Sequence, residues 1–454
     1  MSSPKEVLRS LLSLINSSAE AAIREYEVAG CEVPSIDATA EPQLPTDTTG
    51  LKKALRVLEG AFHQLSITLT PPSTTMFTRA LATNDVACLR VAVNCGIADV
   101  IYGVPEGVHI SKIAVATGLH QGKLLKVMRT LAATHCFRET APQTFANNPL
   151  SLTLRDSNTT SALVKMRSNE TNKCAVSNFY DALVDPEYGH SLDKRRTAWS
   201  WGIKEEMPDA TMFDYFAKHP KTFQQFHRAM GGLSKITGLE GVINQFPWRE
   251  FPQGTTVCDV GSGVGAVSIE LAKKYPNLHL TLQDLPSVIT QAEQRWATEY
   301  PVATAEKRVD YVPFDFFKDL PVRGQDIYYV CLLSRIRQIV HDWPADDAVK
   351  ILKNVRDGAK PGSRILIHEY IVPSGVTSES GVIDAGVETA PKPLLPNYGY
   401  GSARTYLSDV NMLILLNAGE RTLEEFKEIG ARAGLRFVKV WDFLETGLVE
   451  FAPD

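Results

Sequence analysis

The 454-residue chain lacks long hydrophobic runs, paired cysteines and an excess of basic charge. No run approaches the ~18 uninterrupted apolar residues of a transmembrane helix, so we expect no membrane partner. The seven cysteines are scattered without a CxxC pair, which indicates neither a disulfide framework nor a zinc site, and we expect no bound metal. The 47 basic and 52 acidic residues leave a net charge of −5, which gives no reason to expect a nucleic-acid partner.

What is present is an ordinary globular composition, with 44% hydrophobic and 22% charged residues. This composition excludes wholesale disorder, and the length predicts two or three domains. The first residues of the chain are polar, and no convincing cleavage site follows them. This pattern predicts an amphipathic helix rather than a signal peptide. Unpaired thiols in such a chain are typical of a reduced, cytoplasmic protein.

The hydrophobic pattern divides the chain into three parts. Residues 1–75 predict helices joined by a linker rich in proline, threonine and aspartate. Residues 76–235 predict a helical domain that begins with one long helix over 76–101. Two short helices follow, the first with Ser111 as N-cap and Gly118 as stop signal, and then a hairpin-like segment. Residues 236–454 alternate strand and helix.

The order helix, turn, helix and hairpin in the second part is that of a winged helix. Such a domain either binds DNA or serves as a packing or dimerisation module, and its weak basic charge favours the second function. Residues 170–235 are helical and rich in aromatic side chains. These side chains either line a small-molecule pocket or form the core of the domain.

The third part predicts an α/β fold built on a doubly wound parallel sheet. Strands are expected at 255–260, 278–284, 309–315, 326–330 and 364–372. Two final strands, 436–443 and 448–451, flank a short turn. They predict an antiparallel hairpin that joins the sheet.

A glycine-rich loop follows the first of these strands and is the strongest motif. Glycines at this place let the backbone turn tightly and approach a ligand closely. Asp284 ends the next strand, where its carboxylate can accept hydrogen bonds from both hydroxyls of a ribose. Asp259, before the first glycine, suits the ammonium group of a methionine moiety better than a pyrophosphate. The loop therefore favours S-adenosylmethionine over a dinucleotide.

The segments VCDVGSGVG, LQDLP, FDFF, HDWPADDAVKIL and NAGERTLEEF resemble the caffeate-type O-methyltransferase family, especially its fungal secondary-metabolite branch. The resemblance covers the chain from about Leu89 to its end. It implies a helical winged-helix dimerisation domain before a Rossmann-like methyltransferase sheet, S-adenosyl-L-methionine as cofactor, and a homodimer. The cofactor-binding residues expected from loop and resemblance are Asp259, Gly261, Gly263, Gly265, Asp284, Leu285, Asp315, Phe316 and Arg337.

The resemblance also implies that His341 is the catalytic base. A phenol with a pKa of ~10 is a poor nucleophile at neutral pH, and an imidazole can take its proton as the methyl group moves. Glu369 and Glu420 match the carboxylates that flank this base in the family and would orient its ring. On pattern alone, Glu420 is as readily a helix N-terminal charge beside Thr422.

The chain departs from the family pattern between its fourth strand and His341. Seven extra residues, VCLLSRI, precede the family's step from a basic residue to the histidine. They would extend the strand, bulge into the pocket, or reflect an unspliced intron. In the first two cases His341 would be displaced, and about 1 Å of displacement matters to catalysis.

Three functions are compatible with these motifs. The first is an O-methyltransferase acting on a hydroxyl of an aromatic or polyketide-type secondary metabolite. The second is a pericyclase that uses the same cofactor without consuming it. The third is a winged-helix ligand sensor without enzymatic activity. Family position and chemical type suggest these substrate-lining residues: Phe179, Trp201, Phe226, Met230, Asn411 and Met412.

Overall fold

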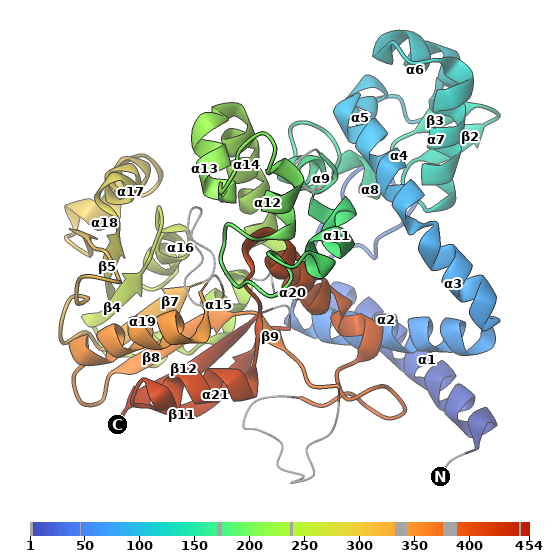
Figure 1. Ribbon diagram of the computed structural model, residues 1–454. Helices are drawn as coiled ribbons and strands as arrows, with labels where there is room; N and C mark the ends of the chain where they lie inside the picture. The colour runs from blue at the N-terminus through green and yellow to red at the C-terminus, as the bar shows by residue number, and fades with distance from the viewer. Residues whose placement is uncertain are drawn as a thin grey trace. The chain divides into compact units, whose positions relative to one another are not determined.

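The computed structural model describes residues 3–45, 47–169, 175–236, 239–331, 341, 343–375, 388–444 and 446–454. The chain divides into two compact units, Met1–Leu233 and Ser234–Asp454. The first unit runs from blue to green in Figure 1 and the second from yellow-green to red. The three-part division expected from the sequence stays a prediction.

The first unit is mainly helical. It begins with α1 and α2, which pack on each other around Ala22, Tyr26, Leu51 and Ala54. Its helices are α1 Pro4–Val28, α2 Thr49–Leu69, α3 Pro72–Ala80, α4 Ala82–Asn94, α5 Ile97–Val100, α6 Ile110–Thr117, α7 Gln121–Ala133, α8 Pro149–Leu152, α9 Thr159–Ser168, α11 Phe179–Val184, α12 Ala198–Ile203 and α13 Met212–Lys218, with α14 Pro220–Ile236 at the unit boundary. Its strands are β1 Val108–His109, β2 Arg138–Ala141 and β3 Thr144–Ala146.

The single long helix predicted over 76–101 is wrong. Three helices, α3, α4 and α5, occupy this stretch. Leu81 closes α3 and opens α4, and Gly96 turns the chain with a φ of +61° before α5. A left-handed residue cannot continue an α-helix, so the apolar period runs on while the helix axis does not.

The segment after α5 follows the predicted order of two helices and a hairpin. Helices α6 and α7 precede β2 and β3, and β1 completes a three-stranded sheet in the order β1-β3-β2. Gly118 ends α6 in the left-handed conformation, as predicted. The N-cap prediction is wrong, because the imidazole of His109, rather than Ser111, accepts the backbone N–H of Ser111 at 3.3 Å.

The second unit contains a seven-stranded sheet, which confirms the predicted α/β fold. Its order is β11-β12-β8-β7-β4-β5-β6. The strands β4 to β8 are parallel, and β12 pairs antiparallel with β8 and β11, as expected for a terminal hairpin. The bounds are β4 Thr255–Val260, β5 Leu278–Asp284, β6 Val309–Pro313, β7 Ile327–Cys331, β8 Arg364–Glu369, β11 Leu435–Asp442 and β12 Gly447–Pro453.

Helices cover both faces of this sheet. The helices α15 Leu239–Gln245, α16 Ala266–Lys274, α17 Pro286–Glu299 and α18 Pro301–Ala305 pack on one face, with the 3₁₀ turn η1 Trp248–Glu250. The other face carries α19 Ala345–Gly358 and α21 Leu423–Arg432. Beyond the sheet lie the turn η2 Gly399–Ser402, the helix α20 Ala403–Leu416 and a parallel pair formed by β9 Ile371–Val372 and β10 Arg421–Thr422.

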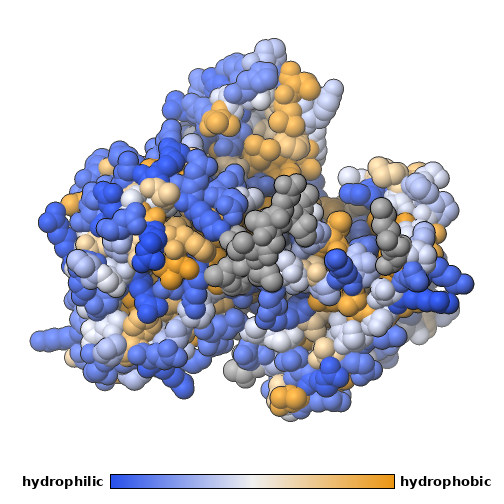
Figure 2. Space-filling model, turned by 90° about the horizontal axis from the view of Figure 1, so that it is seen from below, coloured by the Kyte–Doolittle hydropathy of each residue, from blue (hydrophilic) through white to orange (hydrophobic). Residues whose placement is uncertain are grey.

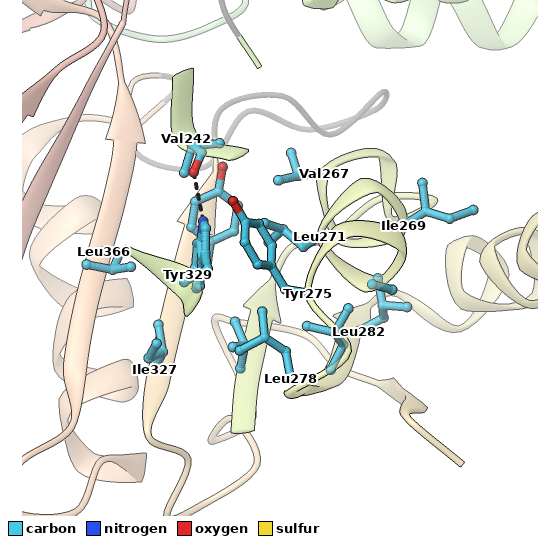
Figure 3. Packing of buried hydrophobic residues seen from close by; sticks show 14 of the residues in the cluster. Val242, Val267, Ile269, Leu271, Tyr275, Leu278, Leu282, Ile327, Tyr329 and Leu366 are labelled. Atoms are coloured by element: carbon cyan, nitrogen blue, oxygen red, sulfur yellow. Dashed lines mark hydrogen bonds between the residues drawn. The ribbon is translucent and has the colours of Figure 1, made fainter. Parts of the chain in front are cut away.

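The first face is closed by large side chains from several elements. Figure 3 shows Val267 and Leu271 of α16 pointing toward Tyr275 and the strands. The indole of Trp248 donates a hydrogen bond of 2.7 Å to the carbonyl of Val242, so its one polar atom is satisfied inside the core. Such a core holds β4 and its neighbours rigidly, which fixes the loops at their carboxyl ends.

The exposed surface mixes polar and apolar side chains. Figure 2 shows one face on which hydrophilic residues predominate and hydrophobic residues lie in separate groups. Within the described residues, no helix is both long and apolar enough to cross a membrane. The five cysteines whose state is described, Cys31, Cys88, Cys95, Cys136 and Cys258, are free thiols.

Candidate active site

The glycine loop lies where the strand order of the sheet reverses. From β4 the chain proceeds outward through β5 and β6, and it then returns to place β7 on the other side of β4. A crevice at the carboxyl ends of the strands is expected at such a switch point. Asp259 and Asp284 lie at the carboxyl ends of the parallel strands β4 and β5, and the predicted glycines follow β4.

The loop needs its glycines. Gly261, Gly263 and Gly265 have φ values of +71°, +57° and +71°. A Cβ atom on Gly265 would lie 2.6 Å from side-chain atoms of both Leu282 and Trp296. At Gly265 the loop is therefore packed against β5 and α17 with no space for a side chain.

The carboxyl group of Asp259 is buried, and only one of its two oxygens accepts a hydrogen bond among the described residues. Its side chain is 3% exposed, and Oδ2 accepts a hydrogen bond of 2.6 Å from the hydroxyl of Ser268. Its Oδ1 atom is buried without a hydrogen-bond partner among the described residues. Burial raises the pKa of Asp259 to about 7; the bond from Ser268 opposes this rise and the charge of Asp284 adds to it. A cationic donor at Oδ1 would complete this site, so the residues fit the ammonium group of a methionine moiety.

Asp284 joins the glycine loop to the next strand. Its Oδ2 accepts the backbone N–H of Gly263 at 2.9 Å, and its Oδ1 accepts the N–H of Leu285 at 2.7 Å. This carboxylate is the one expected to accept hydrogen bonds from the hydroxyls of the ribose. Leu285 is the N-cap of α17 and its backbone, not its side chain, makes the observed polar contact.

The expected adenine-side residues follow β6. The Oδ2 atom of Asp315 pairs with Lys318 at 2.9 Å, and its Oδ1 accepts the N–H of Phe317 at 3.1 Å. Phe316 is buried, and its ring lies 4.8 Å from that of Phe317 in a tilted arrangement. Arg337 lies outside the described residues.

His341 is held by two buried carboxylates from different elements. Its Nδ1 lies 2.8 Å from Oε2 of Glu420, and its backbone N–H donates to Oε1 of Glu369 at 3.0 Å. The imidazole and the Glu420 side chain are 1% and 0% exposed. Glu369 ends β8, and Glu420 precedes β10. With the Nδ1 proton directed at Glu420, the lone pair of the neutral imidazole is on Nε2, where it can accept a proton.

Glu420 is therefore not a helix N-terminal charge. Thr422 caps α21 and forms its capping box with Glu425, whose carboxylate accepts the N–H of Thr422 at 2.7 Å.

The first two residues of the extra segment, Val330 and Cys331, belong to β7. The following residues of that segment lie outside the described part of the chain.

The predicted substrate residues divide between the two units. Phe179, Trp201, Phe226 and Met230 belong to the first unit, where the ring of Phe226 packs 4.9 Å from that of Phe216. The indole of Trp201 donates to Asp185 at 3.4 Å. Asn411 and Met412 lie on α20 of the second unit, with Met412 buried. Their role in substrate binding stays a prediction.

Sequence analysis missed the residues that support the site. Ser268 holds Asp259 from α16, and Ser408 and Asp409 of α20 contact Glu420. The side chain of Arg421 donates to the carbonyl of Trp343 at 2.6 Å. Serine, aspartate and arginine are common on polar surfaces, so only the contacts distinguish them. Among the described residues, no group of three or more His, Cys, Asp or Glu side chains is placed to hold a metal ion.

Known proteins with similar sequences and folds are methyltransferases and related enzymes. An O-methyltransferase domain matches residues 198–383. A relative named 3-O-methyltransferase 2, from Phanerochaete chrysosporium, is 39% identical over 98% of this chain and 97% of its own length. O-methyltransferase gedA from Aspergillus terreus is 30% identical, over 89% of this chain and 87% of its own.

Two solved structures share the fold with a TM-score of 0.68. One is described as a pericyclic reaction enzyme, is 18% identical and covers 98% of this chain and 100% of its own. The other is LepI in complex with SAM, is 19% identical and covers 100% of both chains. At these identities the likeness concerns the fold alone. The sequence relatives are decisive, and the chain belongs to the O-methyltransferase family and is a methyltransferase.

Proposed function

We propose that the protein transfers a methyl group from S-adenosyl-L-methionine to a hydroxyl group of an aromatic or polyketide-type secondary metabolite, with His341 as general base. The buried contact of 2.8 Å between His341 and Glu420 carries this proposal. It lies in the same unit as the glycine loop, so the proposed base and the proposed cofactor site belong to one compact unit.

The cofactor residues have separate tasks in this proposal. Asp259 would bind the ammonium group, Asp284 the ribose hydroxyls, and Asp315 and Phe316 the adenine; Arg337 is expected near the cofactor. When bound, S-adenosylmethionine supplies a methyl group already activated on a sulfonium. The protein therefore has to position the acceptor and remove one proton.

His341 would take the proton of the acceptor hydroxyl at Nε2. This places a positive charge on the imidazole, which Glu420 stabilises through Nδ1. Glu369 fixes the backbone of His341 and so the place of the ring. Both carboxylates are buried, where their electrostatic effect on the imidazolium exceeds that of surface groups.

The acceptor is inferred from the family and from one relative's name. A 3-O-methyltransferase at 39% identity supports a ring hydroxyl as the methylated group. Phe179, Trp201, Phe226 and Met230 of the first unit, with Asn411 and Met412 of the second, are the proposed substrate residues. Flat apolar acceptors favour aromatic and thioether side chains.

We also infer a cytoplasmic homodimer without nucleic-acid partners, in which residues 76–235 contribute dimerisation. The five described free thiols support a reducing compartment. Light scattering should give about twice the 50.0 kDa of one chain. A species of a single-chain mass would contradict the dimer.

A mass-spectrometric time course tests the function. The purified protein is incubated with S-adenosylmethionine and a panel of phenols that differ in hydroxyl position. We expect a product that gains one methyl group in place of a proton, with S-adenosylhomocysteine in equal amount. A substrate that isomerises or loses water while the cofactor stays intact would instead establish a pericyclase. If the protein shows neither activity and binds duplex DNA in a salt-sensitive way, it would be a ligand-sensing regulator.

A further inference from the structure

The carboxylate that orients His341 is itself held by a neighbouring helix. Helix α20 ends at Leu416, and Asn417 turns the chain back with a φ of +51°. This turn returns Glu420 to the side of α20. There the hydroxyl of Ser408 lies 3.3 Å from Oε1 of Glu420, and Oδ1 of Asp409 accepts the backbone N–H of Glu420 at 2.8 Å.

These contacts restrain both the backbone and the carboxylate of Glu420. The hydrogen bond that Glu420 donates to Asp409 restrains its backbone. The hydroxyl of Ser408 donates to one carboxylate oxygen, and the other oxygen faces His341. Gly419 makes the approach possible, because a Cβ atom there would lie 3.0 Å from Oδ1 of Asp409. Two successive residues of α20 thus restrain Glu420, Ser408 at its carboxylate and Asp409 at its backbone N–H.

Asp409 lies close to two other carboxylates. Its side chain is half-buried, and burial together with the nearby carboxylates of Glu420 and Glu425 raises the pKa of Asp409. The hydrogen bond from the backbone N–H of Glu420 needs an acceptor and no charge, so an amide oxygen at position 409 should hold this backbone equally well.

We infer that Ser408 and Asp409 are positioning residues that act through Glu420 on the catalytic imidazole. This inference rests on the proposed role of His341. Because Asn411 and Met412 continue the same helix, α20 would hold the base and the proposed substrate residues in one frame.

The test compares disruptive and conservative variants at both positions. Ser408→Ala and Asp409→Ala remove the hydrogen bonds, whereas Ser408→Thr and Asp409→Asn keep a hydroxyl and an acceptor. Glu424→Gln is the matched control, since it removes an exposed carboxylate of α21 that lies 3.1 Å from the ammonium group of Lys427. We expect kcat to fall about 10–100-fold in the alanine variants. The KM for S-adenosylmethionine should stay within about twofold.

A proton NMR signature separates positioning from general support of the fold. The His341 Nδ1–H that points to Glu420 should give a low-field resonance, assigned by its loss in His341→Gln. We expect this resonance to shift or broaden in both alanine variants and to persist in Ser408→Thr, Asp409→Asn and Glu424→Gln. Unchanged resonance and kcat in correctly folded alanine variants would overturn the inference. If His341→Gln keeps full activity, the proposed base fails, while the resonance still reports whether α20 positions Glu420.

Discussion

The Nδ1 atom of His341 lies 2.8 Å from Oε2 of Glu420, and both side chains are shielded from water. A buried carboxylate beside an imidazole fixes the tautomer and stabilises the protonated ring. The two residues are 79 positions apart in the sequence, so the contact depends on the folded unit.

Replacing His341 should abolish most methyl transfer while leaving the cofactor site in place. His341→Gln keeps an amide that can donate to Glu420, so the buried carboxylate is not abandoned. We expect kcat to fall about 10²–10⁴-fold, which is the usual contribution of a general base. His279→Gln is the control, because His279 pairs with Asp310 on the surface of β5 and β6. Full turnover by His341→Gln would show that another group takes the proton.

The raised pKa of Asp259 predicts that the folded state becomes less stable as the pH rises. Burial raises its pKa from 3.8 to about 7 in the folded state. The folded state therefore binds this proton more tightly than the unfolded state. The resulting stability is complete below about pH 4 and is lost as the pH rises through about 7.

Asp259→Asn removes this titration and keeps an acceptor for Ser268. From about pH 5 to about pH 8, the melting temperature of the wild type should fall relative to that of the variant. Each unit of pKa difference corresponds to about 1.4 kcal/mol, so calorimetric melts can resolve the effect. Parallel melting curves for the two proteins would mean that the Asp259 carboxyl titrates as it does in water.

Asp284 should control cofactor affinity. Its two oxygens hold the N–H groups of Gly263 and Leu285, and an amide in its place can accept only with one atom. We expect Asp284→Asn to weaken S-adenosylmethionine binding about 10–100-fold by titration calorimetry, since hydrogen bonds to charged groups contribute about 1.5–3 kcal/mol. Asp310→Asn, on the adjacent strand and exposed, should bind normally. Equal affinities for both variants would remove Asp284 from the site.

Local patterns explain which parts of the fold were predictable. The strands 255–260 and 278–284 have the predicted bounds because a buried parallel strand is a short apolar run between polar ends. The helix over 76–101 was wrong because its hydrophobic period continues through Leu81 and Gly96, where the backbone changes direction. Hydrophobic periodicity indicates which side chains are buried, but it does not indicate whether they belong to one straight helix or to several.

The candidate site was predictable only where a residue belongs to a motif. His341, Glu369 and Glu420 come together as the family resemblance implied, although spacing alone left Glu420 ambiguous. Ser408 and Asp409 carry no motif, because their partner is reached across the turn after α20. Hydrogen bonds formed by chain reversal leave no periodic trace in a sequence.

The last prediction concerns the space beneath the glycine loop. Gly265 and Gly254 both have positive φ values, +71° and +84°, but a Cβ atom meets nothing within 4 Å at Gly254. At Gly265 it would lie 2.6 Å from Leu282 and from the indole of Trp296. Because an L residue is strained at a positive φ, alanine at either site should lower the stability by about 1–2 kcal/mol. Only Gly265→Ala adds an overpacking cost of about 1–3 kcal/mol and pushes the loop outward. Gly265→Ala should therefore lose both stability and S-adenosylmethionine affinity, while Gly254→Ala loses stability alone. Equal affinity in the two variants would show that the cofactor does not contact this loop.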